Sequence, residues 1–166
     1  MTKRIKIFFF LDQDKFGEDY DCSITSITGI CYTMFRYPTE QEIYNTVESI
    51  GKKYGYSGNR GTNPFMIKMI FDKSLEALSS KKYSTKVGYL KGVGYNFNTI
   101  KNLIDKDIPI ILSFWKCEKY SNHTITIIGY DDETEDLIVA DNWSVRPQKI
   151  NYNNISFISS INYNLS

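Results

Sequence analysis

The sequence NHTITIIGYDDETEDLIVADNW occupies residues 122–143. It contains two apolar runs rich in β-branched residues, HTITIIGY and LIVAD, with the acidic stretch DDETED between them. Such runs are typical of β-strands and the polar stretch is typical of a turn, so we predict a β-hairpin. In a hairpin the start of the first strand faces the end of the second. We therefore expect His123 beside Asp141 and Asn142.

Outward from this hairpin, the chain divides into a helical half and a sheet half. Apolar residues recur at helical spacing over residues 22–35, 43–50 and 65–79. Strands are predicted over residues 5–11, 86–93, 108–115, 149–152 and 155–161, and a short helix over 98–105. This order predicts one α+β domain, 1–166, in which a helical part (about 12–82) packs on an antiparallel sheet (about 83–166).

Composition excludes several classes of partner. The 166 residues carry a net charge of +1 with scattered basic residues, so we expect neither nucleic acid nor an anionic membrane as partner. No window approaches the roughly 18 apolar residues of a membrane span. The start, MTKRIKIFFFLDQD, has too short an apolar run for a signal peptide. We expect a soluble, cytoplasmic protein, with export left open and the oligomeric state unknown.

Cys22 stands where a polar loop becomes an amphipathic helix, with Asp21 as the expected N-cap. The N-terminus of a helix favours a thiolate, the nucleophilic form of cysteine, although a small core residue would also suit this position. Cys31 lies two and a half helical turns further on and is interpreted as core, while Cys117 is the weakest candidate nucleophile. The cysteine spacing gives no disulfide framework and no metal site, and no cofactor is expected.

His123 is the only histidine, so a cysteine nucleophile that needs an imidazole base has one candidate. Asp141 or Asn142 would hold the ring in the right tautomer, although the same residues also suit an ordinary turn after a strand. Gln13 precedes Cys22 by nine residues and would supply an oxyanion donor beside the Cys22 N–H; the alternative is a solvated glutamine. Three aromatic residues are expected to line the substrate groove: Trp115, Tyr120 and Trp143.

The order of these residues resembles papain-like cysteine peptidases, most closely the bacterial C39-like (double-glycine-peptidase-like) group. The segments that carry the resemblance are DQDKFGEDYDCSITSITGICY, DKDIPIILSFW and NHTITIIGYDDETEDLIVADNW. The resemblance implies a papain-like fold and a cysteine peptidase that cleaves a peptide or amide bond. The roles that it implies are Cys22 as nucleophile, His123 as general base and acid, Asp141 as orienting residue and Gln13 in the oxyanion hole.

The sequence also departs from that group. Ser23-Ile24 stands where a Gly-Pro pair commonly follows the nucleophile. Asn142-Trp143 stands where a Pro commonly follows the acid, and it is similar to the Asn-Ser-Trp of papain, which makes Asn142 an alternative orienting residue. Two other functions therefore stay open beside hydrolysis of a peptide, small amide or thioester through an acyl-enzyme. One is an acyltransferase that uses the same triad, and the other is an inactive papain-like binding module.

Overall fold

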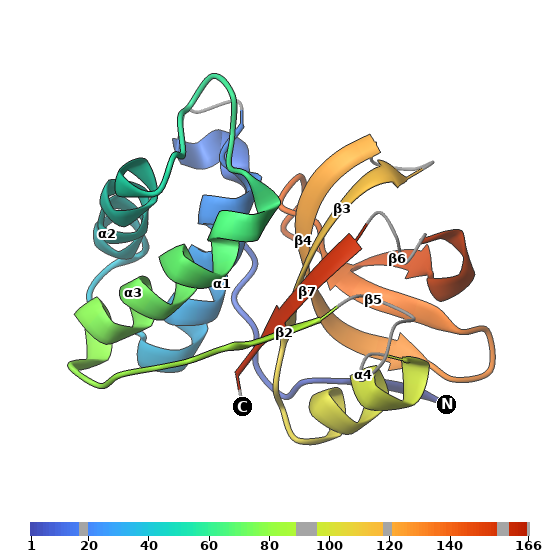
Figure 1. Cartoon of the computed structure of the whole chain (residues 1–166). Helices are drawn as coiled ribbons and strands as arrows, with labels where there is room; N and C mark the ends of the chain where they lie inside the picture. Colours follow the sequence, from blue (N-terminus) through green and yellow to red (C-terminus); the bar gives the residue numbers. More distant parts are fainter. Residues whose placement is uncertain (17–19, 89–95, 118–120, 156–159, 166) are drawn as a thin grey trace.

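The first half of the chain forms three helices, and the second half forms a sheet whose one face they cover (Figure 1). The computed structural model describes residues 1–16, 20–88, 96–117, 121–155 and 160–165. The helical elements are η1 (Gln13–Phe16), α1 (Cys22–Phe35), α2 (Glu40–Lys53), η2 (Pro64–Met66), α3 (Ile67–Ser79), α4 (Phe97–Asp105) and η3 (Tyr152–Asn154). No helix among these residues is long and apolar enough to cross a bilayer.

The sheet is antiparallel throughout, with the strand order β2-β7-β3-β4-β5-β6 and with β1 paired to β4. Its strands are β1 (Thr2–Arg4), β2 (Lys86–Gly88), β3 (Ile110–Cys117), β4 (Ser121–Asp131), β5 (Asp136–Ala140), β6 (Gln148–Asn151) and β7 (Ser160–Asn164). β4 and β5 form the predicted hairpin, in which Thr126 is paired with Ala140 and Asp131 with Asp136. The start of β4 therefore lies at the same end as the segment after β5.

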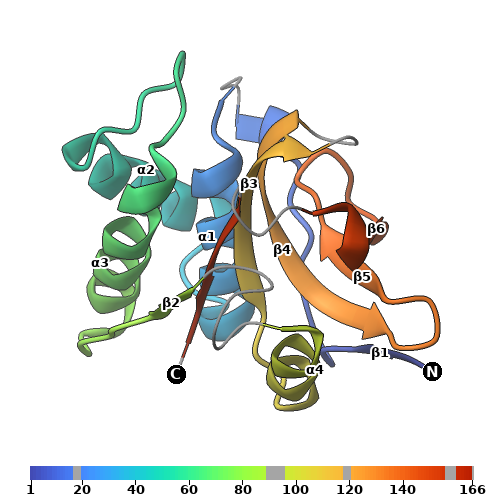
Figure 2. The ribbon, with the colours of Figure 1, turned by 45° about the vertical axis from the view of Figure 1, so that its right-hand side comes forward.

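Two apolar cores lie on opposite faces of the sheet. Because side chains alternate along a strand, neighbouring residues of β3 serve different cores: Ile111 packs with the helices, whereas Ile110 and Leu112 pack on the side of α4. Figure 2 shows α1 between the sheet and the pair α2 and α3. Ile24 and Ile27 are fully buried in the core that the helices share with this face of the sheet. This packing holds the first residue of α1 close to the start of β4.

The prediction of a strand over residues 5–11 is wrong, because the N-terminal strand is β1 and ends at Arg4. Ile5 still donates its N–H to the Ile128 carbonyl of β4 at 2.9 Å, but the apolar residues after it are not in a strand. Phe9 contacts Tyr32, and its N–H donates to the Thr33 hydroxyl at 3.1 Å. Phe8 packs against both cores. The pattern of apolar residues could not distinguish this segment from a strand, because Phe8, Phe9 and Phe10 all contact apolar side chains, as the residues of a buried strand do.

Candidate active site

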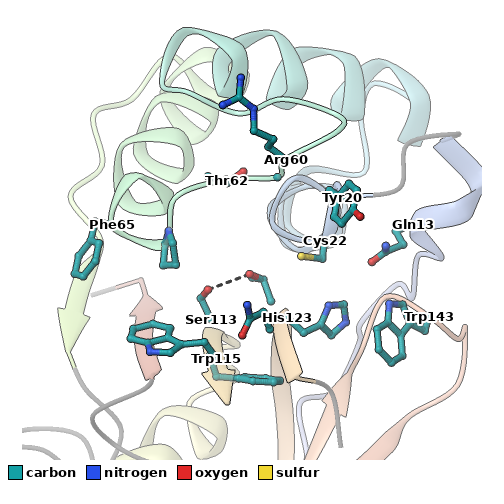
Figure 3. A pocket seen from close by; sticks show the side chains of 15 residues that line it. Gln13, Tyr20, Cys22, Arg60, Thr62, Phe65, Ser113, Trp115, His123 and Trp143 are labelled. Atoms are coloured by element: carbon teal, nitrogen blue, oxygen red, sulfur yellow. Dashed lines mark hydrogen bonds between the residues drawn. The ribbon is translucent and has the colours of Figure 1, made fainter. Parts of the chain in front are cut away.

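Cys22 is the first residue of α1 and is partly exposed in a pocket of about 610 Å³. Gln13, His123 and Trp143 line the same pocket, so residues far apart in the sequence meet there. In Figure 3 the side chain of Cys22 comes from the start of the helix, and that of His123 comes from the strand opposite. Trp115 also lines the pocket. Tyr120, the other aromatic residue predicted at the substrate groove, lies outside the described residues.

Asp21 occupies the N-cap position of α1, as predicted, but its side chain makes no capping hydrogen bond. Its carboxylate is buried and instead accepts a hydrogen bond from the Tyr44 hydroxyl at 2.6 Å. The main-chain carbonyl of Asp21 accepts from the N–H of Thr25 at 2.8 Å, the first bond of the helix. The N-terminal amide groups of α1 are thus not covered by the Asp21 carboxylate, which suits an anion-binding role.

His123 is buried, and its Nε2 lies 2.5 Å from the main-chain oxygen of Asp141. A carbonyl oxygen can only accept a hydrogen bond, so Nε2 carries the proton and Nδ1 holds the lone pair of the neutral ring. The indole of Trp143 covers the imidazole, with ring centroids 4.4 Å apart and planes 33° from parallel. The ring is therefore held in one tautomer and one orientation, with Nδ1 as its proton acceptor.

The carboxylate of Asp141 stabilises the turn that follows β5. Its Oδ1 accepts from the N–H of Trp143 at 3.0 Å and from the N–H of Ser144 at 3.1 Å. These bonds fix the main chain that carries the Asp141 carbonyl, and they place the Trp143 indole over His123. Asp141 therefore acts on the imidazole through its main-chain oxygen, with its charge close by.

Asn142 is buried in the left-handed region, at φ 67°. The two hydrogens of its side-chain Nδ2 are shared among three acceptors: the carbonyl of Cys22 at 3.1 Å, the hydroxyl of Ser26 at 2.8 Å and the carbonyl of Thr124 at 2.9 Å. Its main-chain carbonyl accepts from the N–H of Gln13 at 2.7 Å. These side-chain bonds run between α1 and β4, so the amide that the sequence offered as an imidazole partner joins the two elements that carry Cys22 and His123.

Gln13 begins η1 and is 6% exposed, which excludes the alternative of a solvated loop glutamine. Its main chain is tied to Asn142, and its side chain lines the pocket beside Cys22. Figure 3 shows Gln13 on the same side of Cys22 as Trp143. A glutamine NH₂ in this place, together with the Cys22 N–H, has the chemistry of an oxyanion hole.

The pocket disfavours charge on both reacting groups. Burial raises the pKa of the Cys22 thiol; hydrogen bonds from Thr124 and Ser23 oppose this, and the charge of Asp21 adds to it. Burial lowers the pKa of His123, and the carbonyl and charge of Asp141 oppose this shift. The prediction that the helix N-terminus favours the thiolate therefore omits the larger effect, because desolvation exceeds the hydrogen bonds. Both pKa shifts favour the uncharged forms, a thiol and a neutral imidazole.

Two further pocket residues were missed by the sequence reasoning. Ser113 and Thr124 are paired across β3 and β4, and the Thr124 hydroxyl donates to the Ser113 hydroxyl at 3.1 Å. Both line the pocket, and Thr124 also bonds the Cys22 thiol. The available signal was a hydroxyl residue in each of two strongly apolar strands, ILSFW and HTITII. Cys31, by contrast, is fully buried, as its core interpretation requires.

Among the residues that the structure describes, no group of three or more His, Cys, Asp or Glu side chains is placed to hold a metal ion. Eight more residues complete the lining of the pocket, and most of them come from η2 and the segment before it. They are Tyr20, Arg60, Gly61, Thr62, Pro64, Phe65, Phe114 and Asn122. The site therefore consists of a thiol, an imidazole, amides and hydroxyls beside an aromatic wall.

Comparisons with known proteins agree with this fold and chemistry. A family model described as Peptidase_C39 like family matches residues 4–164. UfSP from C. elegans aligns at a TM-score of 0.58 and 12% identity over 99% of this chain, which spans 34% of the UfSP chain. Xylellain, a cysteine protease from Xylella fastidiosa, aligns at 0.59 and 11%, over 99% of this chain and 85% of xylellain. No curated protein matches. The family match and the shared fold confirm the predicted resemblance and α+β class.

Proposed function

Since the chain belongs to the Peptidase_C39 like family and shares the fold of a cysteine protease, we propose that it is a cysteine hydrolase that cleaves a peptide or amide bond with Cys22 as nucleophile and His123 as base. One observation carries this assignment. The His123 ring is held by the Asp141 carbonyl so that its proton-accepting nitrogen is Nδ1, and it lines the same pocket as the Cys22 thiol at a helix N-terminus. A nucleophile, a base and an orienting group are the parts that acyl transfer needs.

The proposed reaction starts from the neutral pair. The Cys22 sulfur attacks the substrate carbonyl while Nδ1 of His123 takes the thiol proton. The oxyanion that forms accepts hydrogen bonds from the Cys22 N–H and the Gln13 side chain. As the tetrahedral intermediate collapses, the imidazolium gives its proton to the leaving amine, which leaves a thioester on Cys22.

Deacylation uses the same groups in the reverse order of proton transfer. His123 takes a proton from water as the water oxygen attacks the thioester carbonyl. The second tetrahedral intermediate expels the Cys22 sulfur, which regains its proton from the imidazolium and releases the carboxylic acid. The Asp141 carbonyl accepts from Nε2 throughout and so supports the imidazolium in both halves of the reaction.

A peptidyl electrophile tests the assignment without knowledge of the natural substrate. We expect a peptidyl fluoromethyl ketone to label one site, Cys22, as read by peptide mass spectrometry, and labelling to disappear in Cys22→Ala. His123→Ala should slow labelling at least tenfold, because the base is lost. Cys31→Ala is the matched control: it removes a thiol from the same helix, but one that is fully buried, and should leave the rate unchanged. Labelling spread over several cysteines, or a rate independent of His123, contradicts the proposal.

A further inference from the structure

Asn142 makes more hydrogen bonds between the segments of the site than its predicted role of imidazole partner requires. Its Nδ2 contacts the Cys22 carbonyl, the Ser26 hydroxyl and the Thr124 carbonyl, all within 3.1 Å. Its main-chain oxygen holds the N–H of Gln13. Asn142 is thus hydrogen-bonded to three segments of the site. They are helix α1, which begins with Cys22, strand β4, which contains His123, and the segment of Gln13.

The chemistry of these contacts calls for an amide nitrogen. The Cys22 and Thr124 carbonyls can only accept hydrogen bonds, so the atom that faces them has to be a donor, and the orientation of the amide follows. A carboxylate of the same size would place acceptors against acceptors, and an apolar side chain would leave the buried carbonyls without this donor. The backbone adds a second demand, because φ at Asn142 is 67°, a conformation that asparagine and glycine tolerate better than other residues.

The two carbonyls are adjacent to the reacting groups. The Cys22 carbonyl belongs to the nucleophile itself, and Thr124 directly follows His123 in β4. Two other side-chain interactions join these elements here. The Ser26 hydroxyl donates to the Thr124 carbonyl at 3.4 Å and is itself contacted by Asn142, and Thr124 hydrogen-bonds the Cys22 thiol. The amide of Asn142 adds a link from the main chain of the residue that attacks to the strand that carries the base.

We propose that Asn142 is a positioning residue that sets the separation of Cys22 from His123 by clamping the N-terminus of α1 to β4. This inference rests on the proposed function. The Asp141 carbonyl sets the tautomer of His123. Of these two consecutive residues, Asp141 thus orients the imidazole ring, and Asn142 holds the Cys22 thiol close to that ring.

The test is a double-mutant cycle read on the thiol. Asn142→Gly removes the amide and keeps the positive φ accessible, so the turn is not strained. The rate of Cys22 alkylation by iodoacetamide is measured from pH 5 to 10, by peptide mass spectrometry, in wild type, His123→Ala, Asn142→Gly and the double variant. Asn151→Gly is the matched control, because Asn151 also donates two side-chain amide bonds, to Thr134 and Asp136, but lies away from the pocket.

In wild type the imidazole promotes alkylation near neutral pH, and we expect His123→Ala to lower that rate at least tenfold. Asn142→Gly should lower this rate at least fivefold. The double variant should react no more slowly than His123→Ala, because the distance between the thiol and the base has no effect on the rate once the imidazole is absent. Asn151→Gly should match wild type. Asn142→Asp, which keeps the side-chain size, should reproduce Asn142→Gly and covers the case in which the glycine variant does not fold.

The outcomes separate the inference from the proposed function. If His123→Ala slows alkylation but both Asn142 variants react as wild type does, or if the effects of Asn142→Gly and His123→Ala simply multiply, Asn142 does not position the pair and the inference fails alone. If His123→Ala leaves the alkylation profile unchanged, the proposed function fails and the inference falls with it. Circular dichroism and thermal melts on every variant show which rates belong to folded protein.

Discussion

Replacement of Asp141 by asparagine is the sharpest test of how His123 is held. The structure assigns the hydrogen bond to the imidazole to the main-chain oxygen of Asp141, which every substitution at this position retains. The Asp141 carboxylate accepts from the N–H groups of Trp143 and Ser144, and an asparagine Oδ1 can accept both bonds as well. Asp141→Asn should therefore keep the turn, the carbonyl and the tautomer, and should lose only the charge.

The expected loss of rate in Asp141→Asn follows from the separate roles of the Asp141 carbonyl and carboxylate. Where a side-chain carboxylate alone fixes the tautomer of a catalytic histidine, its replacement by an amide costs about 10⁴ in kcat. Here the charge of Asp141 acts on the pKa of His123 less than its carbonyl does. A change of one pKa unit corresponds to about 1.4 kcal/mol, or tenfold, and the charge is the smaller of the two Asp141 effects that raise the pKa of His123. We therefore expect Asp141→Asn to retain more than a tenth of the wild-type rate.

Asp141→Ala removes the two bonds to the turn as well. Hydrogen bonds to a charged acceptor are worth about 1.5–3 kcal/mol each, so roughly 3–6 kcal/mol of local stability is at stake. The carbonyl that holds His123 should then shift, and we expect the rate to fall at least a hundredfold.

The assay is the second-order rate of Cys22 labelling by the peptidyl fluoromethyl ketone at pH 7, with a thermal melt on each variant. Ser144→Ala, which keeps the N–H that Asp141 binds, serves as the control and should react as wild type does. A loss near 10⁴ in Asp141→Asn would refute the reasoning, because it would show that the carboxylate sets the tautomer. Equal losses in the Asn and Ala variants would refute it too, because the turn would then have no part in the rate.

Three further predictions concern the frame around the site. A Cβ added at Gly129 would lie 2.5 Å from the Lys3 oxygen, so Gly129→Ala should displace β1 and lower stability by about 1–3 kcal/mol, seen as faster hydrogen exchange in β1. Tyr44→Phe keeps the aromatic ring but loses the bond to buried Asp21, and a urea titration should show about 1–3 kcal/mol less stability. Burial lowers the pKa of His123 below 6.5, so the unfolded chain binds its proton first. The free energy of unfolding should thus fall as pH drops below 6.5, and His123→Gln should abolish that part of the slope.

The hairpin of β4 and β5 was predictable because its signals are local. Both strands are rich in β-branched residues, and a short polar turn separates them. The length of the turn sets the pairing of the two strands, and this pairing brings His123 close to residue 141. Helical periodicity likewise predicts that Cys31 points away from Cys22, and Cys31 lies in the core of the helical layer. These inferences need no knowledge of how the two halves of the chain pack.

The group that orients His123 was not predictable by the same means. Every residue has a main-chain carbonyl, so no pattern of residue types shows that the carbonyl of Asp141 bonds the ring while its carboxylate caps a turn. The role of Asn142 is hidden for a similar reason. Its partners lie in α1 and β4, up to 120 positions away, and they meet it only after the helical layer has packed on the sheet.

Burial of the two reacting groups decides how the proposed reaction begins. A proton transfer from Cys22 to His123 before substrate binds would create two charges in surroundings that disfavour both, since burial raises the pKa of the thiol and lowers that of the imidazole. When transfer accompanies attack, the negative charge passes to the substrate oxygen beside the Cys22 N–H, and the imidazolium alone stays buried. The Asp141 carbonyl then faces a charged donor instead of a neutral one, and a hydrogen bond to a charged group is the stronger of the two. The contact that selects the tautomer in the resting protein therefore also stabilises the ring in the step that charges it.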